Sequence, residues 1–162
     1  MKLSKNLKKK RSLSRLMAVQ ILYQNDFFAG EKTIAEIKKD LIENYTLNDD
    51  EEPTSYHEKI DEEFLENLLT GSTLDCEGID GEVAYLIKDG WNLDRLDEIL
   101  LQILRLGTFE LKFVRDIPAK VIIDEYVDIT SAFFSDKRLT FANATLDSLA
   151  KKLRAEEFLK KA

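Results

Sequence analysis

The sequence predicts an all-α protein, and three observations lead to that prediction. Its 162 residues include only two prolines and six glycines, so few positions oppose helical backbone. Apolar residues recur at spacings of three and four, the period of a helix with one buried face. The segment KVIID, residues 120–124, is β-prone in composition, but its flanks continue the helical period and no partner strand is evident. We expect about seven helices.

The first predicted helix follows Ser12 and stops near Gly30. Its apolar stripe consists of Leu13, Leu16, Met17, Ile21, Leu22 and Phe28. Thr33 can cap a second helix, and Glu36, three residues later, completes a capping box. The stripe of this second helix is Ile34, Ile37, Leu41 and Ile42.

Residues 48–59 interrupt the pattern with consecutive acids and Pro53, and are predicted to form a solvated loop. The third helix then buries Ile60, Phe64, Leu65, Leu68 and Leu69. Residues 71–91 are ambiguous, because three glycines weaken a helix while helical spacing persists and Gly90 can end it. The residues that keep this spacing are Leu74, Ile79, Val83, Leu86 and Ile87.

The strongest helical pattern is NLDRLDEILLQILRLGTFELKFV, residues 92–114, which indicates a central buried helix. Its inner face is traced by Leu96, Ile99, Leu100, Ile103, Leu106 or Gly107, and Glu110 or Leu111. Pro118 suits the first position of the next helix, where its missing N–H costs nothing. That helix carries Val121, Ile122, Tyr126 and Ile129 and ends near Phe134. After the connection SDKR, a last helix is predicted from about Leu139 to Leu153.

Positive charge is concentrated at the N-terminus of a chain whose net charge is -7. Residues 1–15 hold seven basic and no acidic side chains, whereas the remainder holds 17 basic and 31 acidic ones, a balance of -14. We divide the chain into a basic arm, residues 1–11, and one helical domain, residues 12–162. Basic groups at the positive end of a helix suit phosphate binding. A disordered solubilising tail and a membrane-surface helix remain alternatives, whereas polar interruptions such as Arg15 and Asp26 oppose a secretion signal.

Catalytic and metal-binding patterns are missing from the sequence. His57 is the single histidine and is predicted to lie exposed in the acidic loop. Cys76, the single cysteine, has no CxxC partner, so we expect a small buried thiol and a reducing compartment, the cytoplasm. No glycine-rich phosphate loop and no apolar run of the roughly 18–20 residues that span a membrane occurs. We expect no enzyme, no metal, no cofactor and no membrane partner.

Several motifs are similar to a known family. RSLSRLMAVQILYQ, residues 11–24, resembles the opening of the NusB family of bacterial transcription antitermination factors. WNLDRLDEILLQILRLGTFEL, IPAKVIIDEYVDITSAFF and FANATLD follow in the order and spacing of that family. The resemblance implies two packed helical bundles forming one compact domain. It also implies binding of boxA-type leader RNA with NusE, a small-subunit ribosomal protein, joined by other Nus factors and RNA polymerase in ribosomal RNA transcription.

The resemblance also implies site residues. RNA binding maps to Lys9, Lys10, Arg11, Arg15, Gln20 and Tyr23 in the N-terminal region. It maps further to Lys137, Arg138, Phe141 and Asn143, in and after the loop before the last helix. Arg11 and Arg15, four residues apart, share a helix face and are expected to grip adjacent phosphates or bases.

A basic partner such as NusE is expected to contact the acidic body in its central region. The acids proposed for this contact are Glu98, Glu110, Asp124, Glu125 and Asp128. Asp124 stands in DEY where the family has NEA, and Ala144 in FANA where it has FVNG. A homodimer that hides this face is an alternative. Alternative functions are an RNA-binding accessory module in ribosomal RNA processing or modification, and a non-specific RNA binder.

Overall fold

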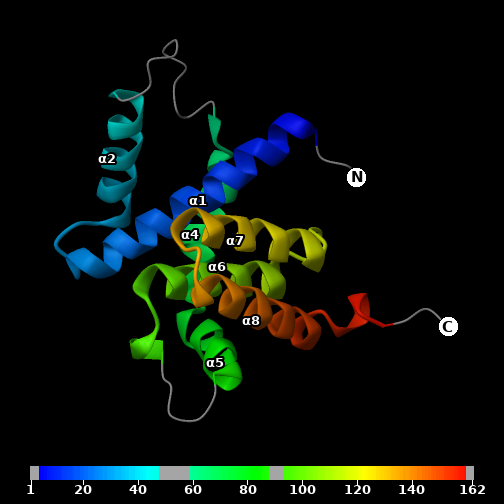
Figure 1. Ribbon diagram of the computed structural model, residues 1–162. Coiled ribbons are helices and arrows are strands. Elements are labelled where there is room, and N and C mark those ends of the chain that lie inside the picture. The colour runs from blue at the N-terminus through cyan, green and yellow to red at the C-terminus, as the bar shows by residue number, and fades with distance from the viewer. Residues whose placement is uncertain (1–3, 48–58, 88–92, 160–162) are drawn as a thin grey trace. The chain divides into compact units, whose positions relative to one another are not determined.

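A computed structural model of the chain describes residues 4–47, 59–87 and 93–159 (Figure 1). Across these ranges the regular structure consists of seven α-helices and two short 3-10 helices, with no strand. The prediction of an all-α fold is therefore confirmed. Most of the predicted acidic loop, including His57, lies outside the described residues, as does the predicted helix stop at Gly90.

The chain divides into two compact units, Met1–Leu69 and Thr70–Ala162, with the boundary inside one helix. The first unit contains α1 (Lys5–Phe28), α2 (Ile34–Leu47) and the start of α4 (Glu62–Leu74). Two ion pairs join α2 to α4, because Lys38 Nζ donates to Glu62 Oε2 at 2.9 Å and to Glu66 Oε1 at 2.6 Å. The residues predicted to be buried by the third helix are confirmed as buried, although the first of them precedes α4: Ile60, Phe64, Leu65, Leu68 and Leu69.

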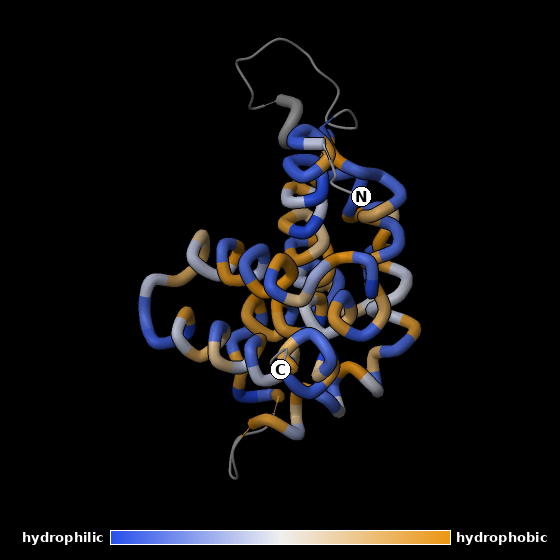
Figure 2. The backbone as a smooth tube through the Cα atoms, turned by 90° about the vertical axis from the view of Figure 1, so that its right-hand side faces the viewer, coloured by the Kyte–Doolittle hydropathy of each residue, from blue (hydrophilic) through white to orange (hydrophobic). Residues whose placement is uncertain are grey.

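The second unit is built around α6 (Glu98–Phe113). This helix packs against α7 (Ala119–Phe133) and α8 (Lys137–Leu153), which also pack against each other, and α5 (Cys76–Leu86) covers α6 and α8. The short 3-10 helices η1 (Leu93–Arg95) and η2 (Ala155–Glu157) precede α6 and follow α8. Hydrophilic and hydrophobic stretches alternate along the helices (Figure 2). The core residues of α6 are Leu100, Ile103, Leu104, Leu106, Phe109 and Leu111, which confirms a buried central helix.

Capping side chains set where the helices begin. The α1 helix starts at Lys5, earlier than predicted, because Ser4 Oγ accepts from the Leu7 N–H at 3.2 Å. Its first turns therefore include the basic residues 8–11. The predicted cap of α2 is confirmed, since Thr33 Oγ1 accepts from the Glu36 N–H at 3.1 Å. Pro118 lies one position before the first residue of α7.

The α1 helix ends where the sequence predicts. Ala29 has a φ of 48° and Gly30 a φ of 91°, both in the left-handed region, and the Ala29 N–H donates to the Asn25 carbonyl. One prediction in the ambiguous segment, the burial of Cys76, is wrong. Leu74, which keeps the helical spacing of this segment, is 82% exposed at the end of α4. Cys76, predicted to be buried, is exposed because it starts α5 instead of lying within its packed face.

Candidate nucleic-acid interface

The predicted RNA-binding residues of α1 fall on two faces of the helix. Eleven residues make about three turns, so Lys9 and Gln20 lie on one face, with Tyr23 close to the same line. Lys9 is exposed, and Gln20 and Tyr23 are half-buried. This face combines a cation, an amide and an aromatic ring, which are the groups that contact phosphates and unstacked bases.

Lysines carry the exposed charge at the start of α1. Lys5, Lys8 and Lys9 are exposed, whereas Lys10 is half-buried. Lys8 and Lys9 form no ion pair with any residue that the structure describes. No acidic side chain occupies the first turn, so these charges add to the positive end of the helix dipole. The surface is suited to a polyanion.

Arg11 and Arg15 point to the other side of α1. Their guanidinium carbons lie 4.8 and 4.9 Å from the ring centroid of Phe64, and Arg11 Nε donates to Asp61 Oδ2 at 3.3 Å. Ser14 Oγ accepts from the Asp61 N–H at 2.9 Å. Only 3% of Arg15 is exposed. The expectation that both arginines grip phosphates from an exposed arm therefore needs correction for Arg15, whose guanidinium is used in packing α1 against the start of α4.

The second predicted group lies on α8. Lys137 and Arg138 form its first turn and not a loop, because Asp136 caps the helix by accepting from the Arg138 N–H at 3.0 Å. Lys137, Arg138 and Asn143 are exposed, and Phe141 is half-buried. These four residues and those of α1 belong to different compact units.

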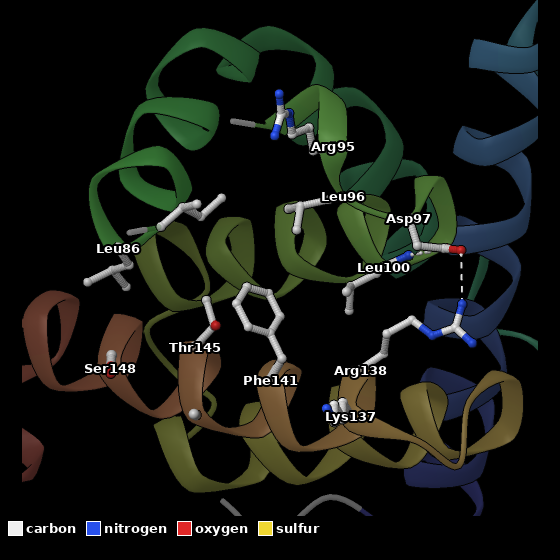
Figure 3. A pocket seen from close by; sticks show the side chains of 12 residues that line it. Leu86, Arg95, Leu96, Asp97, Leu100, Lys137, Arg138, Phe141, Thr145 and Ser148 are labelled. Carbon is white, nitrogen blue, oxygen red and sulfur yellow. Dashed lines mark hydrogen bonds and ion pairs between the residues drawn. The ribbon is translucent and has the colours of Figure 1, made fainter. Parts of the chain in front are cut away.

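A pocket of about 800 Å³ lies beside this turn. Phe141 projects from α8 toward Leu96 and Leu100 on its opposite wall, and Arg138 stands near one end (Figure 3). The remaining lining residues are Leu86, Ile87, Arg95, Asp97, Lys137, Ala144, Thr145 and Ser148. An apolar interior with a cationic rim suits an aromatic base attached to a phosphate.

Arg138 is held by two carboxylates of the chain. Its Nε and Nη2 donate to Asp136, and its Nη1 lies 3.4 Å from Asp97 Oδ2. The side-chain hydrogen bond from Arg138 lowers the pKa of Asp136 to about 2, and the same bond raises the pKa of Arg138. Neither acid was singled out from the sequence, although an acid directly before a helix is a recognisable capping signal.

The predicted partner residues divide by burial. Glu98, Asp124 and Asp128 are exposed, and Glu125 is half-buried. Glu110 is the exception: it is fully buried in α6, and its carboxylate accepts a hydrogen bond from the Tyr126 hydroxyl. The assignment of Glu110 to a surface contact is therefore wrong, because its carboxylate stabilises the α6–α7 packing instead.

The described residues contain neither a membrane-spanning helix nor a metal-binding cluster. None of their helices has both the length and the apolar character required to cross a membrane. Among the same residues, no cluster of three or more histidine, cysteine or acidic side chains is arranged to hold a metal ion.

Comparisons with solved structures support the fold. The NusB structure from T. maritima has a TM-score of 0.71 and 26% sequence identity, covering 98% of this chain and 99% of the other. A crystal structure of the antitermination factors NusB and NusE in complex with dsRNA has a TM-score of 0.69 and 22% identity, covering 92% and 99%.

Sequence comparisons extend the likeness to curated proteins. The transcription antitermination protein NusB of Novosphingobium aromaticivorans is 38% identical over 90% of this chain and 96% of its own length. NusB of Maricaulis maris is 36% identical over 96% of this chain and 94% of its own length. Residues 12–151 match the NusB family model. With most of the chain matched by both kinds of comparison, this protein belongs to the NusB family.

Proposed function

We propose that this protein is an RNA-binding transcription antitermination factor that binds boxA-type single-stranded leader RNA together with NusE. In this role it supports ribosomal RNA transcription in the cytoplasm and catalyses no reaction. The observation that carries the proposal is family membership, joined to an exposed lysine surface on a chain of net charge -7. Its curated relatives bear the name transcription antitermination protein.

We assign phosphate contacts to the exposed lysines. Lys8 and Lys9 extend from the positive end of α1, and Lys137 from the first turn of α8. Phosphate contacts position an RNA without reading its sequence. Base recognition would fall to the half-buried aromatics Tyr23 and Phe141, which offer ring faces for stacking.

The buried arginine contributes indirectly under this proposal. Arg15 and Arg11 hold α1 against Phe64, which fixes the direction of the exposed face. Replacing them would change both the packing and the charge, so they are poor probes of RNA contact. Gln20 and Asn143 are the amide side chains among the predicted RNA-binding residues, and amides are groups that hydrogen-bond base edges.

We propose the exposed face of α7 as the contact for basic NusE. Val121, Asp124 and Asp128 follow one another at spacings of three and four, so they share a face. Val121 is 44% exposed, and both acids are exposed. An apolar contact beside carboxylates suits a cationic protein surface. The complex would then join other Nus factors and RNA polymerase.

The RNA surface is tested with the double substitution Lys8→Ala and Lys9→Ala. We expect affinity for a boxA-type single-stranded RNA to fall roughly tenfold, with a log–log salt slope smaller by about 1.4 because two phosphate contacts are lost. Filter binding over a salt series measures both quantities.

The matched control is Lys39→Ala with Lys120→Ala, which removes the same charge from exposed positions on α2 and α7. Equal losses in the two double variants would reject a specific role for the start of α1. A scrambled RNA of equal length should compete more weakly than the boxA sequence. Equal competition would reduce the proposal to non-specific RNA binding.

A further inference from the structure

Arg138 makes contacts within the free protein that resemble the recognition of a phosphate. Its Nε donates to Asp136 Oδ1 at 3.0 Å, and its Nη2 donates to Asp136 Oδ2 at 2.6 Å. Two parallel N–H bonds to two oxygens are also the geometry in which arginine binds a phosphate. The third contact, from Nη1 to Asp97 Oδ2, is longer at 3.4 Å. The donors that would meet RNA are thus already engaged.

A buried ring also contacts this guanidinium. The guanidinium carbon of Arg138 lies 4.1 Å from the ring centroid of Phe134, which is only 9% exposed. Two carboxylates surround one guanidinium, so the three charged groups together carry a charge of about -1 at neutral pH. The rim of the pocket therefore attracts a phosphate less strongly in this state than the neighbouring cations Lys137 and Arg138 would suggest.

The two carboxylates are held by helix-capping hydrogen bonds, whereas the arginine side chain can change its conformation. Asp97 Oδ1 caps α6 by accepting from the Ile99 and Leu100 N–H groups at 2.9 and 3.2 Å. Asp136 caps α8 in the same way. Moving either acid would release a helix end, but the Arg138 side chain is 44% exposed and has several rotatable bonds. An exchange of partners would thus proceed by movement of Arg138.

We propose that Asp136 and Asp97 occupy Arg138 in place of an RNA phosphate and that RNA binds at this pocket by taking Arg138 from Asp136. We call Asp97, Asp136 and Arg138 the Arg138 clasp. The clasp regulates the proposed RNA site, so this inference rests on the proposed function. It lowers affinity for phosphate alone and favours a nucleotide whose base enters the pocket beside Phe141 while its phosphate replaces the carboxylate.

The variant Asp136→Asn tests the clasp. Asparagine caps helices about as well as aspartate, so α8 is retained while one carboxylate charge is removed. We expect boxA-type RNA to bind about two- to fivefold more tightly, the range that corresponds to loss of an exposed ion pair. The salt slope should become steeper by about 0.7, because Arg138 gains one phosphate.

The matched control is Asp147→Asn on the same helix. Asp147 is exposed to a similar degree and pairs with Lys151 at 2.9 Å, so the substitution changes net charge equally without touching the clasp. We expect Asp147→Asn to increase the affinity for RNA only slightly. When Arg138→Ala is added, Asp136→Asn should increase the RNA affinity no more than Asp147→Asn does, because the guanidinium that would move to the phosphate is absent.

The outcomes separate the two proposals. If wild-type protein binds boxA RNA but Asp136→Asn gains no more than Asp147→Asn, the clasp is rejected and the proposed function stands. A gain that persists in the Arg138→Ala background also rejects the clasp, since Arg138 would not mediate it. If wild-type protein fails to bind the RNA, the proposed function is rejected, and the clasp is rejected with it.

Discussion

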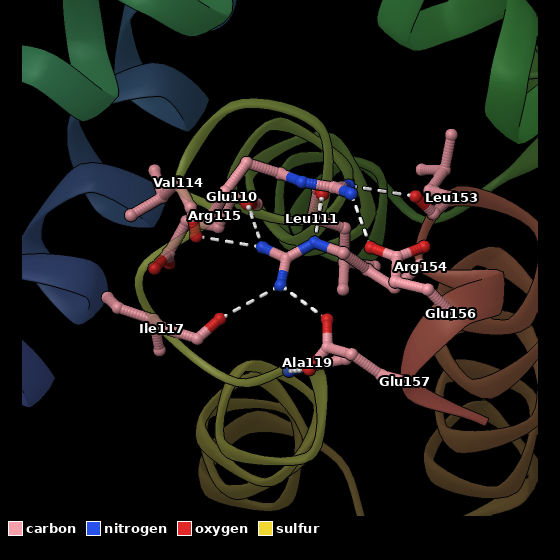
Figure 4. A network of polar contacts seen from close by, with 10 residues as sticks. All are labelled: Glu110, Leu111, Val114, Arg115, Ile117, Ala119, Leu153, Arg154, Glu156 and Glu157. Atoms are coloured by element: carbon pink, nitrogen blue, oxygen red, sulfur yellow. Dashed lines mark hydrogen bonds and ion pairs between the residues drawn. The ribbon is translucent and has the colours of Figure 1, made fainter. Parts of the chain in front are cut away.

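Arg154 uses its guanidinium in a way that contrasts with the exposed Arg138. Only 1% of Arg154 is exposed, and all five of its N–H groups have acceptors (Figure 4). Four acceptors are the backbone carbonyls of Glu110, Leu111, Val114 and Ile117, and the fifth is the Glu157 carboxylate. Burial raises the pKa of Glu157, but hydrogen bonds from the Ala119 N–H and from Arg154 outweigh it, and the pKa is lowered overall. One side chain thus satisfies the end of α6 and ties it to the chain after α8.

Replacing Arg154 by Met should lower the free energy of unfolding by about 3 kcal/mol or more, because buried carbonyls and a carboxylate lose their donors. Thermal unfolding followed by circular dichroism measures the change. The control is Arg115→Met: Arg115 also bonds a backbone carbonyl and an acid, Leu153 and Glu156, but is 50% exposed. That substitution should cost less than about 1 kcal/mol. Equal losses of stability in the two variants would show that the burial of Arg154 does not increase its contribution to stability.

At the scale of elements, apolar spacing predicted which segments are helical but not where they begin. The stripe from Leu96 placed the central helix correctly, yet α6 starts at Glu98 because Asp97 caps it. The basic residues before Ser12 were separated as an arm because of their concentrated positive charge. They are helical because lysine and arginine are good helix formers and Ser4 caps them. Local capping chemistry, which spacing does not describe, decides these boundaries.

Two glycines also show that helix propensity, a local property, does not predict contacts made by tertiary packing. Gly71 lies inside α4, where a Cβ would approach Phe109 Cε2 to 2.3 Å, whereas a Cβ on Gly81 of α5 would meet nothing within 4 Å. Helix propensity treats both alike as weak points. Only the packing of the buried Phe109 ring explains why α4 needs a glycine at this position.

We therefore expect alanine at these two positions to have opposite effects. Gly81→Ala should stabilise the protein by about 0.5–1 kcal/mol through helix propensity. Gly71→Ala should destabilise it by about 1–3 kcal/mol, because the Phe109 ring must move. Urea unfolding of both variants measures the sign. If Gly71→Ala stabilised the protein, the Phe109 ring would be able to move aside without lowering the free energy of unfolding.

For the whole molecule, the sequence predicted the residue types of the candidate site better than it predicted which of their side chains are exposed. Charge asymmetry drew attention to the N-terminus, and the family motifs selected the individual residues. Neither could separate exposed Lys9 from buried Arg15, nor exposed Asp124 from buried Glu110, because these differences arise when helices pack. Asp136 and Asp97 were overlooked because their role depends on Arg138, which comes near Asp97 only in the folded chain.

The excess of acids outside the first fifteen residues leads to the last prediction, which concerns the partner. Purified protein should form a one-to-one complex with its cognate NusE in size exclusion, and boxA RNA should strengthen it. If NusE tightens RNA binding, RNA must tighten NusE binding by the same factor.

The substitutions Asp124→Lys and Asp128→Lys should together slow association with NusE about tenfold at low salt and less at high salt, because salt screens the electrostatic steering of the two proteins. Glu31→Lys with Glu43→Lys makes the same charge change at exposed positions before and within α2 and should slow it less. An equal effect of both pairs would indicate steering by net charge alone, and absence of a complex even with RNA would contradict the proposed partnership.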